Sequence, residues 1–184
     1  MSDSATTSTP ARPWIRGHLL DLAVFLGLAL LAPWVVHFIP SWDDSPIGAK
    51  LLPIFYAPLI AALTGRGQVA VVVAMLAPWV NHFLFGMPPR PMAIFLTIEL
   101  AVFSIVTVSM ASRWAGRAWL GPVAYLAVKP VGYIALLVFP SLMPFMSATN
   151  YLTSATIQAW PGLIVLAVLS MSVSKMFPPH ASAH

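Results

Sequence analysis

Six apolar segments, each close to the length needed to cross a lipid bilayer, take up almost the whole chain between residues 18 and 177. About 20 helical residues span the hydrocarbon core, where only helices and closed barrels satisfy all their backbone hydrogen bonds. The segments are 18–39, 51–64, 68–85, 92–112, 119–140 and 152–177. They predict an all-α polytopic membrane protein, with six transmembrane helices in one domain between a flexible tail at 1–17 and a short tail at 178–184.

Composition argues against a water-soluble protein. Hydrophobic residues make up 59% of the chain and charged residues 8%, whereas soluble domains have about 25% charged residues. The lysines and arginines are scattered singly near the ends of the apolar segments, so the basic character does not indicate nucleic-acid binding. The absence of cysteine excludes disulfides and thiolate metal sites. Nothing is left over for a catalytic domain, so we expect no enzymatic activity.

The connections between the segments differ in positive charge. One side of the predicted bundle collects most of the basic residues, whereas the other has only Lys50 and Arg90. The basic side carries Arg12, Arg16, Arg66, Arg113, Arg117 and Lys175. Because cytoplasmic loops are enriched in Lys and Arg, both termini are predicted to be cytoplasmic, in the inner (plasma) membrane of a cell. The outer side then carries residues 40–50, 86–91 and 141–151.

Three ionisable residues lie within the apolar segments, namely Asp21, Glu99 and Lys129. A charge at the bilayer centre costs at least about 2.5–3.5 kcal/mol, so each of them needs a partner or a function. Asp21 lies near the predicted cytoplasmic surface, where Arg16 or interfacial water is expected to satisfy it. We expect Glu99 and Lys129 to meet, either as a purely structural ion pair or as part of a binding site.

Most other polar side chains within the segments fall in the predicted outer leaflet, at a similar depth in five of the helices. This arrangement predicts a cavity open to the outside that binds a small-molecule substrate. The candidate lining residues are Trp34, His37, Asn81, His82, Glu99, Lys129, Tyr133, Gln158 and Trp160. For Trp34 and for Trp79, which lie near helix ends, a place in the aromatic belt facing lipid headgroups fits equally well.

His37 and His82 occupy matching positions in two similar stretches, 32–38 and 77–83. Two histidines at equal depth are a pattern that haem or a metal ion uses. No second pair of histidines accompanies them, and the other three histidines fall on the opposite side of the predicted bundle. We therefore expect neither a metal nor a cofactor.

Several short motifs follow one another along the apolar segments. They are Leu52-Pro53, Thr64-Gly65-Arg66-Gly67, Gly86-Met87-Pro88-Pro89, Ile98-Glu99-Leu100-Ala101-Val102-Phe103 and Trp160-Pro161-Gly162-Leu163. Their order, with six spans and cytoplasmic termini, resembles the membrane-embedded substrate-binding S component of energy-coupling factor (ECF) vitamin transporters, over about residues 18–177. The run Val128-Lys129-Pro130 and the proline-rich start of the second span depart from that family, which leaves the identity of the substrate open.

The resemblance implies a protein that captures a vitamin-like or heterocyclic micronutrient from outside and docks on a transmembrane T component carried by two ATPases. It implies a docking face of small residues on the first helix, here Ala23 and Gly27, although internal helix packing fits these two residues equally well. It also implies that residues 41–50 gate the pocket and that the fourth to sixth helices supply many of the ligand contacts. The chain has no GxxxxGK[ST] phosphate loop, so energy for uphill transport has to come from a partner or a gradient.

Two other classes of function fit the sequence. Residues 51–112 also resemble the four-helix membrane sensor segment that precedes some bacterial histidine kinases. Alternatively, the chain is an accessory structural subunit whose polar groups bind a larger membrane complex and no ligand. A transport subunit predicts saturable solute binding and copurification with a T component, a sensor predicts a kinase partner, and an accessory subunit predicts neither.

Overall fold

The computed structural model of the protein describes residues 13–40, 50–114 and 116–177, and for residues 13–16 and 37 it describes the backbone alone. Within these ranges the chain forms helices and turns with no strand, which confirms the predicted all-α class. The elements are α1 (Pro13–His37), η1 (Pro53–Phe55), α3 (Tyr56–Leu63), α4 (Gly67–Phe85), α5 (Arg90–Trp114), α6 (Leu120–Val138), η2 (Pro140–Leu142), α7 (Ala148–Ile157) and α8 (Trp160–Met176), where η marks a short 3₁₀ helix.

The first helix begins earlier than predicted. Residues 13–17, which we expected in a flexible tail, form the first turns of α1. Proline is favoured at the first position of a helix because its ring fixes φ and its missing N–H has no partner there in any case. Residues 1–12, the tail 178–184 and residues 41–49 of the predicted outer loop lie outside the described residues.

Four helices are long and apolar enough to cross a membrane, namely Gly17–Val36 within α1, Gly67–Phe85, Arg90–Trp114 and Leu120–Val138. The predicted second span is too short, because η1 and α3 together cover only Pro53–Leu63. The predicted sixth span is divided into α7 and α8, which meet at an angle of 55°. If this bent pair crosses as one span, the described part of the chain has five spans of sufficient length, so the six predicted spans are not confirmed.

Proline explains the break between α7 and α8. The new helix begins with Trp160 and Pro161, and Pro161 occupies its first turn. Proline at that place has no N–H to continue the hydrogen bonding of α7, and in a continuous helix its ring would clash with the carbonyl group four residues earlier, that of Ile157. The chain therefore changes direction at Gln158 and Ala159, and α8 starts again from there.

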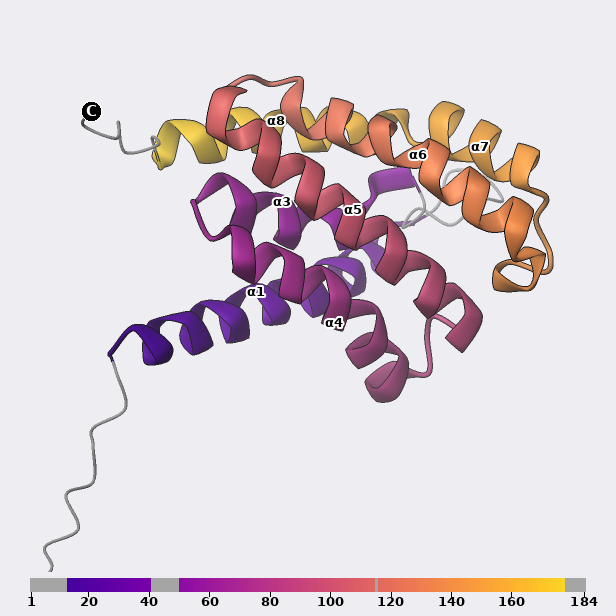
Figure 1. The fold of residues 1–184 in the computed structure, drawn as a ribbon, viewed down its shortest axis with the longest axis horizontal. Coiled ribbons are helices and arrows are strands. Elements are labelled where there is room, and N and C mark those ends of the chain that lie inside the picture. The colour runs from indigo at the N-terminus through magenta and orange to yellow at the C-terminus, as the bar shows by residue number, and fades with distance from the viewer. Residues whose placement is uncertain (1–12, 41–49, 115, 178–184) are drawn as a thin grey trace, which may run out of the picture.

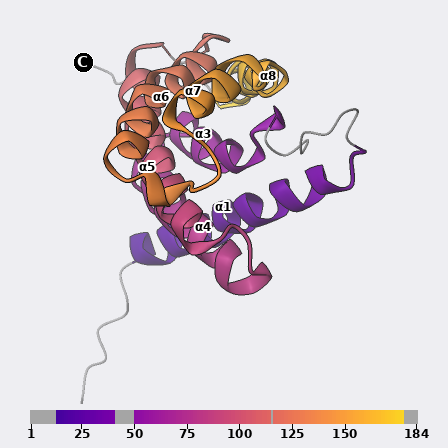
Figure 2. The ribbon, with the colours of Figure 1, turned by 90° about the vertical axis from the view of Figure 1, so that its right-hand side faces the viewer.

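The helices form three layers. Figures 1 and 2 both show α3 and α5 in the middle, with α6, α7 and α8 on one side and α1 and α4 on the other. α5 packs against both α4 and α6, α8 packs against α6 and α3, and α1 packs against α3 and α4. In Figure 1 the start of α1, the α3–α4 turn, the α5–α6 connection and the end of α8 lie toward the left, and the α4–α5 and α6–α7 connections lie toward the right.

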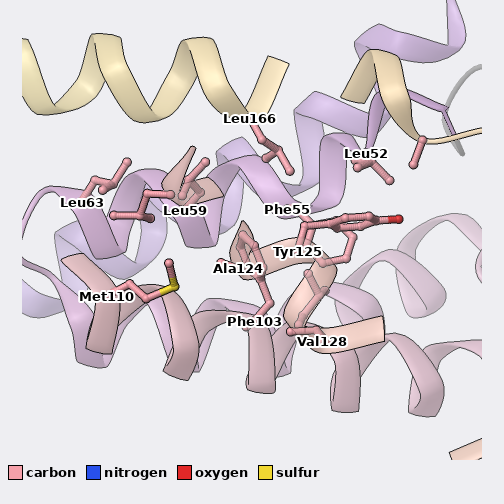
Figure 3. Packing of buried hydrophobic residues seen from close by; sticks show 14 of the residues in the cluster. Leu52, Phe55, Leu59, Leu63, Phe103, Met110, Ala124, Tyr125, Val128 and Leu166 are labelled. Atoms are coloured by element: carbon pink, nitrogen blue, oxygen red, sulfur yellow. The ribbon is translucent and has the colours of Figure 1, made fainter. Parts of the chain in front are cut away.

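Two clusters of buried apolar side chains join these layers. The larger one lies between α3, α5, α6 and α8, and in it the ring of Phe55 meets Phe103 and Tyr125 edge-on, at centroid distances of 5.0 and 5.1 Å. Figure 3 shows these rings between the helices. The smaller cluster joins Phe25 and Ala29 of α1 to alanines and valines of α3 and α4. In lipid, such close packing is the main source of helix association.

The segment before η1 crosses α8 in very close contact. A Cβ added at Gly162 would lie 2.5 Å from the carbonyl oxygen of Lys50 and 2.6 Å from the Cγ of Leu52. Leu52 itself has a φ of 59°, a left-handed conformation that costs an L residue about 1–2 kcal/mol. Only a glycine at this place on α8 allows the chain to approach so closely.

The outward faces of the long helices are apolar. Leu20 on α1, Ile134 on α6 and Ile164 on α8 are all more than half exposed. Soluble monomers rarely expose apolar patches larger than a few hundred Å². These faces therefore fit contact with lipid, which agrees with the prediction of a membrane protein.

Candidate functional site

An ion pair is buried where α5 packs against α6. Nζ of Lys129 on α6 donates a hydrogen bond to Oε1 of Glu99 on α5, at 2.9 Å. Each of the two residues is only 3% exposed. The two charges meet because both side chains lie on the faces by which these neighbouring helices contact each other. Each charge thereby compensates the other, as a buried charge requires.

Tyr151, on α7, is the third member of this cluster. Its hydroxyl donates a hydrogen bond to Oε1 of Glu99 and accepts one from Nζ of Lys129 at 3.1 Å. The three side chains thus form a closed set of hydrogen bonds, in which the same carboxylate oxygen accepts from both the ammonium and the phenol. Three separate helices supply the three groups.

Aromatic rings surround the ammonium group. Nζ of Lys129 lies 4.0 Å from the ring centroid of Tyr125, 5.5 Å from that of Phe55 and 5.4 Å from that of Tyr151. A cation within about 6 Å of a ring centroid is attracted by the π electrons. The ring of Phe95 packs edge-on against Tyr151 at 5.2 Å. The cluster therefore combines a cation, an anion and flat apolar walls.

The space around the pair is filled, although we expected a hollow there. A Cβ added at Gly132 on α6 would lie 2.6 Å from the hydroxyl oxygen of Tyr151 and 2.8 Å from Oε1 of Glu99. Glycine at this position is therefore what lets the phenol and the carboxylate approach the backbone of α6. Within the described part of the chain, Tyr151 and Tyr125 pack against Lys129 where we expected a cavity, and Glu99 and Lys129 are each 3% exposed.

Several predicted lining residues lie at the surface. Trp34 is 55% exposed, and its ring contacts Phe38 edge-on at 4.8 Å. Trp160 is 62% exposed, and Gln158, the residue that ends α7, is exposed as well. Tyr133 is half-buried on α6, and its hydroxyl has no hydrogen bond to any described residue. These four side chains are not enclosed with the ion pair.

The polar side chains at the end of α4 form hydrogen bonds with nearby backbone carbonyl groups. Nδ2 of Asn81, which is buried, donates to the carbonyl oxygen of Ala77 at 3.0 Å. Nδ1 of His82 lies 2.8 Å from the carbonyl oxygen of Pro88, which accepts from it. The side chain of His37 is outside the described part of the structure. Among the described residues, no three His, Cys, Asp or Glu side chains gather closely enough to hold a metal ion.

Asp21 forms an ion pair with a residue of the α3–α4 turn. Nε of Arg66, in the α3–α4 turn, lies 2.7 Å from Oδ2 of Asp21, and the two side chains are 39% and 27% exposed. The side chain of Arg16, which the sequence predicts in this role as an alternative to interfacial water, lies outside the described residues. The pair borders a pocket lined by His18, Val108 and residues 65–69. This pocket lies at the basic side of the molecule, and neither Glu99 nor Lys129 lines it.

The predicted docking face on α1 points away from the bundle. Ala23 is exposed, and a Cβ added at Gly27 would meet nothing within 4 Å. The residues of α1 that pack inward, Phe25 and Ala29, lie on the opposite side of this helix. The alternative that Ala23 and Gly27 serve internal helix packing is therefore not supported by the described contacts.

Sequence reasoning missed the aromatic part of the site. Tyr151 was placed at the end of an outer loop, whereas it lies in the first turns of α7. One local signal was available, because Ser147 accepts a hydrogen bond from the backbone N–H of Asn150 and so caps this helix. Phe55, Phe95, Tyr125 and Gly132 carried no comparable signal, since aromatic and small residues are frequent in every apolar segment.

Comparison with known proteins found no significant similarity. No family model matches this chain, and no curated protein or solved structure is significantly similar to it. Any function assigned to the chain therefore rests on its own residues and geometry.

Proposed function

We propose that the protein is a membrane-embedded subunit that binds a small zwitterionic or heterocyclic solute from outside the cell, for uptake driven by partner ATPases. The observation that carries this proposal is the buried pair of Glu99 and Lys129 between two apolar helices. Ionisable residues inside membrane helices are costly and usually mark a substrate or ion pathway.

The chemistry of the cluster supports this kind of ligand. Glu99 accepts hydrogen bonds and Lys129 donates them, and hydrogen bonds to charged groups are about twice as strong as those between neutral groups. The rings of Phe55, Phe95 and Tyr125 offer apolar faces on which a flat ring stacks. A solute that carries both charges, or a heterocycle with donors and acceptors, matches these groups best.

If the protein takes part in uphill transport, the energy has to be supplied by partner subunits. The sequence lacks a phosphate-binding loop. The resemblance to ECF S components suggests a transmembrane T component with two ATPase subunits, and it places the docking face at Ala23 and Gly27. The outward orientation of these two small residues is compatible with such a contact.

Native mass spectrometry of the gently solubilised protein tests the proposal. We expect the wild-type protein to carry a bound small molecule and to copurify with membrane and ATPase subunits. The small molecule is expected to be lost from Glu99→Gln and Lys129→Met, because each variant removes one of the two charges that hold it. Both variants are expected to reach the membrane like the wild-type protein.

Asp21→Asn is the matched control, because it removes an ion-paired carboxylate at the other side of the molecule. This variant is expected to keep the small molecule. A wild-type protein without any bound solute, or the same bound mass in all three variants, would contradict the proposal.

An accessory structural subunit is the second candidate function. It is favoured by the enclosure of the pair, because Glu99 and Lys129 are buried and hydrogen-bonded to each other and to Tyr151. In that case the same spectra would show copurified membrane subunits, and no small molecule in any of the variants.

A further inference from the structure

The hydroxyl of Tyr151 occupies the position between the two charges of the proposed site. It donates to Glu99 and accepts from Lys129, while its ring packs edge-on against Phe95. These are the contacts that a ring-shaped ligand with a hydroxyl group would make. Of the three hydrogen-bonded side chains, the phenol alone comes from neither α5 nor α6, so it can leave without separating these two helices.

α7 is a separate short element that is suited to carry Tyr151 away. It bends by 55° from α8, with only Gln158 and Ala159 between the two helices. Thr149, Asn150 and Thr153 are exposed on α7, and so is Ile157 at its end. A rotation at the break between α7 and α8 would move α7 and leave α8 in place.

α7 is held on the bundle by hydrogen bonds and by one apolar cluster. Besides the bonds of Tyr151, the hydroxyl of Tyr125 donates to the carbonyl oxygen of Ala155 at 3.0 Å. A small apolar cluster, with Phe95, Leu136 and Tyr151 at its core, completes the contact. Tyr151 takes part in both the polar and the apolar contacts, so its release weakens both kinds of contact between α7 and the bundle.

No solute reaches Glu99 or Lys129 while α7 is in this position, because both side chains are 3% exposed and Gly132 leaves no room for another atom. We propose that Tyr151 holds the place of the ligand in the empty site, and that the solute enters by displacing Tyr151 together with α7. This inference rests on the proposed function, and it assigns a gating and specificity-determining role to Tyr151.

Displacement of a phenol also defines the class of ligand. The incoming group has to donate one hydrogen bond to Glu99 and accept one from Lys129. It has to be attached to a flat ring, which then packs against Phe95 in place of the ring of Tyr151. A hydroxylated aromatic ring, or a heterocycle with an N–H beside a carbonyl oxygen, meets these conditions. An aliphatic zwitterion fills the polar part of the site but leaves its aromatic walls uncovered.

Hydrogen exchange of the α7 backbone tests the gating role without any ligand. Tyr151→Phe keeps the ring and deletes both hydrogen bonds, so α7 is expected to open more often and its amides to exchange at least about tenfold faster in lipid nanodiscs. Tyr56→Phe is the control, because it removes another tyrosine hydroxyl, one that bonds to the carbonyl of Leu51 in a different part of the core. Equal exchange of α7 in both variants would overturn the gating role.

p-Cresol, which has the shape of the tyrosine side chain, tests the ligand class. In Tyr151→Ala the truncated side chain leaves space beside Glu99 and Lys129, and cresol at about ten times its Kd is expected to raise the Tm by about 3–5 °C. Toluene, which lacks the hydroxyl, is expected to raise it much less. Tyr56→Ala is the control, and cresol is expected to leave its Tm unchanged.

Equal stabilisation by cresol and toluene, or equal stabilisation of both alanine variants by cresol, would overturn the ligand class. If Tyr151→Ala does not fold, the exchange experiment with Tyr151→Phe decides the gating role alone. Failure of the proposed function is distinguishable, because it would appear as a wild-type protein without a bound solute, whatever cresol does in the variant.

Discussion

Glu99 and Lys129 show how an apolar helix bundle accommodates full charges. The pair is buried, its geometry is that of a direct hydrogen bond, and a phenol satisfies further bonding capacity of both groups. A buried pair of this kind contributes little net stability, because the desolvation of both groups offsets their attraction. Loss of one partner is different, since it leaves the remaining charge without compensation.

Substitution of either charged residue is therefore expected to destabilise the protein. Glu99→Gln and Lys129→Met should each lower the free energy of unfolding by about 3–5 kcal/mol. The double variant should lose less than the sum of the two, because neither charge is then left alone. Unfolding in detergent, followed by circular dichroism, measures all three values.

Asp21→Asn serves as the comparison for these variants. Its partner Arg66 and Asp21 itself are both partly exposed, so the substitution is expected to cost at most about 1 kcal/mol. Strictly additive losses at Glu99 and Lys129 would show that the two charges do not depend on each other.

For single residues, the ion pair was predictable from the sequence, but the side chains that surround it were not. Two opposite charges in neighbouring apolar segments have few ways of being satisfied, so their meeting was predictable. Tyr151 was not, because it follows Lys129 after η2 and a turn, and no local pattern sets the position of α7 over α6. The same holds for Trp34 and Trp160, whose exposure depends on the rotation of each helix about its axis.

The two irregular elements, η1–α3 and α7–α8, depend on proline and glycine. The sequence indicated a kinked or shortened helix in the second span, where Pro53 and Pro58 are five residues apart. The sequence analysis did not predict that Trp160 and Pro161 begin a new helix instead of lying within a longer one. Apolar periodicity continues across this break, so a prediction based on apolar length joins the two helices into one span.

Gly162→Ala is expected to disturb the crossing between α8 and the segment before η1. The new methyl group would lie 2.5 Å from a backbone oxygen, which has no side-chain freedom to move away. We expect a loss of about 1–3 kcal/mol in the free energy of unfolding, which is typical of overpacking. Thermal unfolding of the purified protein measures this loss.

Gly17→Ala is the matched control on α1, where an added Cβ meets nothing within 4 Å. Since alanine is favoured over glycine inside a helix by about 0.5–1 kcal/mol, this variant should be as stable as the wild-type protein or slightly more stable. Equal effects at both glycines would mean that the close crossing at Gly162 does not exist in the membrane.

For the whole molecule, the sequence predicts that both termini face the cytoplasm. The structure places the start of α1 and the end of α8 toward the same side, together with the α3–α4 turn and the α5–α6 connection (Figure 1). These are also the connections that carry most of the basic residues. The number of membrane crossings depends on η1 and α3. Together they connect one side of the molecule to the other, although they are too short for a normal membrane span.

Thiol labelling in intact cells tests this orientation, and the chain has no cysteine of its own to interfere. Ser141→Cys lies in η2, and Ser112→Cys lies in the last turn of α5; both positions are exposed. A membrane-impermeant maleimide is expected to label Ser141→Cys and to leave Ser112→Cys unlabelled until the cells are broken. The reverse pattern would place the basic side outside and the termini with it.

Solute affinity, measured by isothermal titration calorimetry with the compound that copurifies with the wild-type protein, tests the central claim most directly. If the buried pair is a binding site, Glu99→Gln and Lys129→Met will each weaken binding more than about tenfold, which corresponds to about 1.4 kcal/mol, whereas Asp21→Asn will bind like the wild-type protein. Wild-type affinity in both Glu99→Gln and Lys129→Met would show that the pair only holds α5 and α6 together.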